Sequence, residues 1–352
     1  MHLSRLFISR LATAFQKANR QYVVRSIAAM CAMVLVVSSV MACNIPVFRY
    51  ALERWKPDAC EIVVFHEGPL ASEQLESIET LKTQIVRREK RDTNSLRLVE
   101  ISDLSADEDT LWKSLRAKHP DSELPLVNVR MQLGRGRAAN AWSGTLAKAQ
   151  DVGIFDSPAR RELSKRLLNG HSVVWIVVQS AHDDIEKKKQ LDSRIDQILR
   201  DNLESLSNSI ELPEGIGLPG SELHSEIPLL LKFSLLEIDP KDPEEAFLTG
   251  LFTQIQPEAF GEGEPLIVPV FGRGRALEVI PASSFSDRLM QDLSVFLSGA
   301  CSCQVKEQNP GFDLLMSTDW DTELFGEGVA PPPERTTRDR ENPVLLTIPP
   351  GR

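Results

Sequence analysis

The sequence contains the same pentapeptide twice, as Gly134-Arg135-Gly136-Arg137-Ala138 and as Gly272-Arg273-Gly274-Arg275-Ala276. This repeat indicates how the chain is divided into domains. A proline followed by apolar residues precedes each copy, at 125–129 and at 265–269. Copies this far apart indicate duplicated domains rather than a solenoid of short units. We therefore expect each pentapeptide to form the turn of a hairpin in one of two related domains.

The hydrophobic pattern around each copy predicts the same order of elements. In the first half it predicts strands at 61–65, 96–101, 126–131 and 139–143, and helices at 72–88, 107–118 and 157–168. In the second half it predicts strands at 173–179, 230–238, 266–271 and 276–280, and helices at 183–206, 243–252 and 286–297. Each half therefore reads β-α-β-α-β-β-α, which makes the chain an α/β protein.

This order, with a proline opening the third strand, resembles the thioredoxin fold. The resemblance implies a cis-proline at Pro125 and makes Pro265 a second candidate. We predict two tandem thioredoxin-like domains, 58–170 and 171–327, after an N-terminal signal or lipobox helix. The alternative is a single mixed α/β domain built from the same elements.

Dithiol chemistry at the usual place in such a fold is excluded. A thioredoxin-type oxidoreductase needs a Cys-x-x-Cys where the first strand meets the first helix, because the helix N-terminus lowers the pKa of the thiol. These junctions read Glu67-Gly68-Pro69-Leu70 and Ser180-Ala181-His182-Asp183, without a cysteine. We find no spaced acid–base pair either, and we assign no catalytic residue and no cofactor.

Residues 1–42 have the pattern of an export signal. Five basic residues and no acid occupy 1–25, and the 17 residues of 26–42 are uncharged. Without this leader the chain holds 35 basic against 50 acidic residues, a net charge of −15. A body this acidic does not have the basic footprint of a nucleic-acid-binding protein.

The leader ends in Val40-Met41-Ala42-Cys43, which resembles the lipobox of bacterial lipoproteins. The resemblance implies that Cys43 carries lipid and that 43–57 is a linker. Residues 43–50, together with the later cysteine segment, resemble a family of exported bacterial lipoproteins to which no activity is attached. We expect a membrane-anchored protein at the outer membrane or the periplasmic face. The alternative is a single-pass signal anchor in the inner membrane.

The thiols that remain are Cys60, Cys301 and Cys303, too few for a disulfide framework. The Cys301-Ser302-Cys303 segment allows three interpretations. The cysteines are structural, with one of them able to pair with Cys60; or they are redox-active; or they hold a soft metal such as Cu(I).

The repeated loops offer a second candidate site. Glycines free successive N–H groups and arginines add forked donors, so Arg135, Arg137, Arg273 and Arg275 are candidates for anion binding. The simpler interpretation is a pair of glycine-rich turns whose arginines lie in solvent or bridge acids of the body.

The chain ends in a proline-rich stretch, 328–352, that we expect to be disordered. We expect the whole to be a non-catalytic binding or scaffolding module that contacts the membrane and an envelope protein. The alternative is a thiol-redox or soft-metal-handling lipoprotein that uses Cys301 and Cys303.

Overall fold

The computed structural model describes residues 44–88, 95–133, 137–219 and 221–332, and those from Asn44 onward form one compact unit. The predicted leader, Cys43, Arg135 and most of the predicted tail lie outside the described residues. Within the described ranges, no helix combines the length and the apolar character needed to cross a bilayer.

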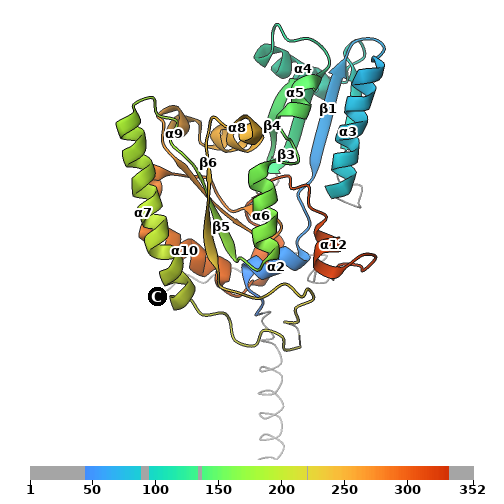
Figure 1. The fold of residues 1–352 in the computed structure, drawn as a ribbon. Coiled ribbons are helices and arrows are strands. Elements are labelled where there is room, and N and C mark those ends of the chain that lie inside the picture. The colour runs from blue at the N-terminus through green and yellow to red at the C-terminus, as the bar shows by residue number, and fades with distance from the viewer. Residues whose placement is uncertain (1–43, 89–94, 134–136, 220, 333–352) are drawn as a thin grey trace, which may run out of the picture. The chain divides into compact units, whose positions relative to one another are not determined.

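The first sheet has the strand order β2-β1-β3-β4 (Figure 1). Its strands are β1 (Cys60–His66), β2 (Ser95–Glu100), β3 (Leu126–Leu133) and β4 (Arg137–Thr145). β1 runs parallel to β2 and antiparallel to β3. Helices α3 (Ser72–Arg88) and α5 (Leu146–Asp151) contribute to the core on one face, and α4 (Ala106–Lys118) contributes to the core on the other.

The second sheet repeats this topology in the order β6-β5-β7-β8-β10. Its strands are β5 (Val173–Val178), β6 (Phe233–Ile238), β7 (Leu266–Phe271), β8 (Arg275–Ala276), β9 (Ile280–Pro281) and β10 (Phe312–Asp313). β5 is parallel to β6 and antiparallel to β7, and β9 pairs with β7. Its main helices are α7 (Ile185–Ser209), α8 (Ala246–Ile255) and α10 (Asp287–Ser298), with the short η1 (Pro243–Glu245) and α9 (Pro257–Gly261) beside α8.

The strands on either side of each pentapeptide pair at equivalent positions. Leu133 pairs with Arg137 across the first turn, and Phe271 pairs with Arg275 across the second. Among the described residues the Leu124–Pro125 bond is the one cis peptide, so the resemblance is confirmed at Pro125, whereas the bond before Pro265 is trans. Two sheets with the same parallel and antiparallel pairings make this a protein of two thioredoxin-like domains.

The predicted strand 276–280 is wrong in detail, because β8 and β9 divide it. The Leu277 N–H donates to the Pro269 carbonyl of the partner strand β7, but Pro269 has no N–H to donate in return. The pairing of β7 with β8 therefore stops at Val270, and its pairing with β9 begins at Ile267.

The predicted helix 157–168 forms as α6 (Pro158–Leu168), with Ser157 as its N-cap. However, α6 packs against β5 and β6 of the second sheet, and the short α5 packs beside β3, β4 and α3 of the first. The helix that we expected to close the first domain therefore packs on the second sheet. One continuous core runs through both sheets and includes Leu163 and Leu167 of this helix.

The predicted linker 43–57 contains a helix, α2 (Val47–Arg54), in which every residue is buried. Arg49 and Glu53 form an ion pair of 2.9 Å on this helix. Arg49 also donates to the carbonyls of Ser225 and Ile227, so α2 holds the long connection that follows α7. The apolar residues Phe48, Ala51 and Leu52 share one face of this helix, and the charged residues can be buried beside them because they satisfy one another.

The chain after α10 returns to the second sheet, where β10 pairs with β8. It forms α11 (Cys303–Gln308), strand β10 and α12 (Trp320–Phe325). Pro46 forms an isolated β-bridge with Ala300, so the beginning of the described chain lies beside the cysteine segment.

Candidate functional site

The junction of β1 and α3 in the first domain holds polar groups at the ends of two parallel strands. His66 and Glu100 are paired in the register of β1 and β2. The Glu100 carboxylate accepts from the Gly68 N–H at 2.9 Å and lies 3.5 Å from His66 Nδ1. This carboxylate holds the turn where a thioredoxin would carry its thiols.

The equivalent junction in the second domain is closed by its own residues. Ser180 Oγ donates to the carbonyl of Gly263 at 2.5 Å, across to the loop before β7. A side chain at Gly263 would lie 2.9 Å from the Cα atom of His182, so only glycine fits this contact. Lys188 Nζ donates to the Ser180 carbonyl at 2.8 Å. The junction is therefore packed and hydrogen-bonded without a thiol.

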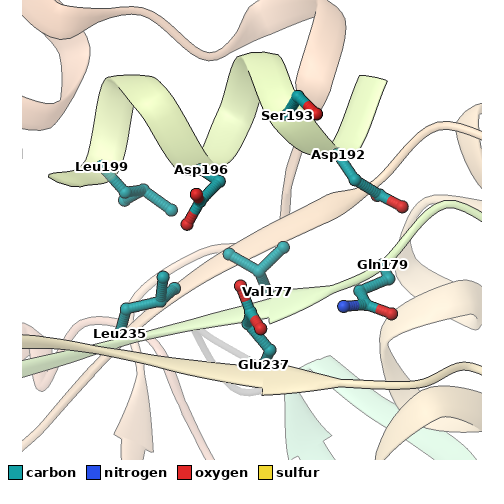
Figure 2. Close-up of a pocket in the computed structure, with 8 residues that line it drawn as sticks. All are labelled: Val177, Gln179, Asp192, Ser193, Asp196, Leu199, Leu235 and Glu237. Carbon is teal, nitrogen blue, oxygen red and sulfur yellow. The ribbon is translucent and has the colours of Figure 1, made fainter. Parts of the chain in front are cut away.

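A pocket of about 200 Å³ lies close to this junction, between α7 and the strands β5 and β6 (Figure 2). Its apolar surface comes from Val177, Leu199 and Leu235. Its polar residues are Gln179, Asp192, Ser193, Asp196 and Glu237. Figure 2 shows Asp192 and Asp196 extending from α7 toward the strands, with Glu237 rising from β6.

The pocket has more negative than positive groups. Asp192 Oδ1 accepts from the Ser180 N–H at 2.7 Å, and Asp196 Oδ1 accepts from Arg200 Nε at 2.6 Å. Arg200 lies 4.0 Å from Glu237, and its side chain is 64% exposed. An exposed guanidinium screened by water compensates only weakly for nearby carboxylates, so the pocket keeps an acidic character.

This combination suits one kind of ligand group. Lysine and arginine side chains bury an apolar stem and keep a charged end in polar surroundings. The apolar side chains can contact the stem, while the three carboxylates face the charge. A bare metal ion is a poorer fit, since no group of three or more His, Cys, Asp or Glu side chains among the described residues could hold one.

The sequence did not point to this pocket. Asp192 and Asp196 have the i, i+4 spacing that puts two residues on one helix face, and this was the available signal. Many exposed helix faces carry such a pair, and nothing in the sequence says that this face meets the ends of β5 and β6.

The two cysteines of the predicted Cys301-Ser302-Cys303 site differ in their exposure to solvent. Cys301 is buried and Cys303 is exposed as the first residue of α11. Cys60 is buried at the start of β1. None of the three is in a disulfide, so the pairing with Cys60 that the sequence allowed is not formed.

The described arginines of the second pentapeptide are held by the chain itself. Arg273 donates to Asp321 at 2.8 Å and to the carbonyls of Leu52 and Glu53. Arg275 pairs with Asp58 at 3.0 Å, and its remaining donors reach the carbonyls of residues 309–311. These two side chains bridge acids, as in the simpler interpretation. In the first copy, Arg135 and the side chain of Arg137 lie outside what the structure describes.

The glycines of the second turn are required by packing. Gly272 and Gly274 have positive φ angles of 58° and 82°. A side chain on Gly272 would lie 2.6 Å from the Ala51 Cβ atom, and one on Gly274 would clash with the Met316 side chain. The turn is therefore enclosed by α2 on one side and by the C-terminal segment on the other.

The comparisons with known proteins assign no activity to the chain. No family model matches the sequence, and a search of curated proteins finds no significant match. Among solved structures, the chain is similar to the first two thioredoxin domains of Eps1p from Naumovozyma dairenensis, with 10% sequence identity and a TM-score of 0.22. That match covers 67% of this chain and 90% of the other.

Proposed function

We propose that this chain is a membrane-anchored protein of the bacterial cell envelope, at the outer membrane or the periplasmic face, that binds a partner without catalysing a reaction. Its partner would place a lysine or arginine side chain in the pocket between α7 and β6. The observation that carries this proposal is the acidic pocket beside a thiol-free junction, with Asp196 and Glu237 on opposite walls.

The anchor is supported by the sequence. The basic start, the uncharged stretch of 26–42 and Cys43 together resemble an export signal with a lipobox. If Cys43 carries the lipid, Cys43→Ala abolishes labelling by a fatty-acid analogue in the producing cells. A variant that still labels contradicts the assignment of Cys43, and a wild-type chain that stays associated with membranes without labelling favours a single-pass signal anchor.

Partner binding is tested with a photoreactive amino acid at Ser193, an exposed residue of the pocket. We expect a crosslinked protein in intact cells, and we expect Asp196→Asn with Glu237→Gln to abolish it. The matched control neutralises two exposed acids of α3, Glu76 and Glu79, and should leave the crosslink unchanged. A crosslink that persists after the pocket is neutralised, or no crosslink at all, contradicts the proposed binding site.

A second candidate function rests on the exposure of Cys303 two residues from the buried Cys301. A thiol-redox or soft-metal-handling protein needs one thiol that a reagent or metal can reach. Elemental analysis and a thiol count on the purified chain, with and without reductant, test this role. An oxidised pair or bound copper favours it, whereas two reduced, metal-free thiols contradict it.

A further inference from the structure

An apolar turn projects from the connection between α7 and β6. Residues 212–219 include the apolar side chains Leu212, Pro213, Ile216, Leu218 and Pro219, and one charged residue. Leu218 is 62% exposed, and Pro219 beside it is exposed as well. Apolar side chains that adjoin on the surface are available to another surface.

The turn is held in a fixed shape. The Gly217 N–H donates to the Ser221 carbonyl, and the Ser221 N–H donates back to the Leu218 carbonyl, both at 2.8 Å. Gly215 and Gly217 have positive φ angles of 81° and 86°, a conformation that favours glycine. Leu218 is thus presented at the end of a closed hydrogen-bonded turn.

Asn44 holds this turn in place. Its backbone N–H donates to Ser221 Oγ at 2.9 Å, and its Nδ2 donates to the Glu214 carbonyl at 2.6 Å. A side chain on Gly215 would lie 2.9 Å from Asn44 Nδ2, so the two segments touch. Asn44 is the residue that follows Cys43, and the uncharged stretch of 26–42 ends just before it. The apolar turn therefore lies where the described chain begins.

Other exposed apolar residues belong to the same end of the molecule. Val295 and Phe296 are exposed on the last turn of α10, and Gly299, which follows this helix, accepts from the Val47 N–H at 3.0 Å. Figure 1 shows α2, the end of α10 and the connection after α7 at one end of the view. Glu214 within the turn and Glu211 and Glu222 on either side of it are acidic, so attraction to anionic lipid does not account for this surface.

We infer that residues 212–219 dock, through Leu218, into the interfacial layer of the bilayer to which Cys43 is attached. This inference rests on the proposed membrane anchor. The occupant is a lipid surface because the covalent anchor would keep a bilayer within reach of Asn44 at all times. Apolar contact at a second point then adds to the membrane affinity that the lipid chain supplies, and stable attachment generally takes two such signals. The second contact also restricts how the body tilts on the membrane.

The experiment uses the full chain in vesicles of phosphatidylethanolamine and phosphatidylcholine that contain spin-labelled lipid. The exposed thiol is removed by Cys303→Ser, and Leu218→Cys then receives an environment-sensitive fluorophore. The matched control places the same fluorophore at Ile185, which is 77% exposed at the other end of α7. A helix of 25 residues puts the two ends of α7 about 37 Å apart.

We expect emission at shorter wavelength and quenching by the spin label at position 218, and neither effect at 185. Flotation of the chain with the vesicles reports the anchor separately. If the chain floats while position 218 emits as in water, or if both positions respond equally, the docking of the turn is wrong and the anchor stands. If the chain does not float, the anchor is wrong and the inference fails with it.

Discussion

Ser157 Oγ donates a hydrogen bond of 2.7 Å to Glu245 Oε2, and this buried contact joins the N-cap of α6 to the short helix η1 before α8. The other carboxylate oxygen accepts from the Ala159 N–H at 2.6 Å. Arg160 packs over the Phe247 ring, 5.2 Å from its centroid, and donates to the carbonyls of Leu314 and Leu315. Burial raises the pKa of Glu245, with the hydrogen bonds from Ala159 and Ser157 acting against it.

Glu245→Ala should lower the free energy of unfolding by about 1–3 kcal/mol, because it leaves the buried hydroxyl and N–H without their acceptor. The control is the neighbouring Glu244→Ala, whose side chain is exposed and whose effect should stay within about 0.5 kcal/mol. Urea unfolding followed by circular dichroism measures both. Equal effects would show that Glu245 is not an anchor of α6.

Arg49→Met should cost about 3–5 kcal/mol of stability, because it leaves the buried Glu53 carboxylate without its charge partner. Arg288 and Asp292 form an i, i+4 pair of the same type on the surface of α10, and Arg288→Met should change stability by less than about 0.5 kcal/mol. Adding Glu53→Gln to Arg49→Met should recover part of the loss, because the amide removes the unpaired charge while its oxygen can still accept from the N–H groups of His224 and Ser225. A surface variant as damaging as the buried one would contradict the role given to α2.

His171 should make the protein sensitive to acid. Burial, with Lys232 and Arg166 nearby, lowers the pKa of His171 to about 4, and Glu162 acts in the opposite direction. The unfolded chain binds this proton below about pH 6.5, while the folded chain resists it down to about pH 4. Stability is therefore lost as the pH falls through this window.

The test compares His171→Gln with the wild-type chain in urea unfolding across that window. The variant should lose less stability on acidification, because its side chain does not titrate. Glutamine can still bond to Ser234 Oγ, which lies 2.8 Å from His171 Nδ1 in the wild type. Parallel stability curves would show that other groups cause the acid sensitivity.

Cys303 should be the thiol that reacts in the folded body, while Cys60 and Cys301 react only after unfolding. A thiol-specific reagent followed by peptide mass mapping measures this directly, and Cys303→Ser should remove the rapid reaction. Fast modification of Cys301 in the native protein would mean that the cysteine segment opens.

Helices with regular apolar spacing or clear caps were predictable, and segments stabilised by buried charges were not. α3 begins and ends at the residues expected, 72 and 88, and Ser157 is the predicted N-cap of α6. α2 escaped prediction because Arg49, Glu53 and Arg54 make it look like an exposed linker. Its partners, among them Ser225 and Ile227, are distant in sequence, so no local pattern indicates them.

The thiol-free junctions were evident from the sequence, because the absence of a cysteine from a short segment can be seen without knowing the fold. The pocket was not evident, since it arises where a helix face meets two strand ends. Likewise, the ion pairs of Arg273 and Arg275 depend on Asp321 and Asp58, which belong to opposite ends of the body. The sequence predicted the glycine-rich turn and two roles for its arginines, anion binding or pairing with acids of the body. Only the fold shows which acids lie next to these arginines.

The burial of α2 also affects the order in which contacts form during synthesis, because the chain is made from its N-terminus. Arg49 donates to the carbonyl of Ile227, 178 residues later in the chain, and the Leu52 carbonyl accepts from Arg273, 221 residues later. Contacts of such long sequence separation form slowly. The helix α2 therefore completes its packing only after the second domain has been made, and a chain truncated before residue 225 would lack the buried partners of Arg49 on the connection after α7.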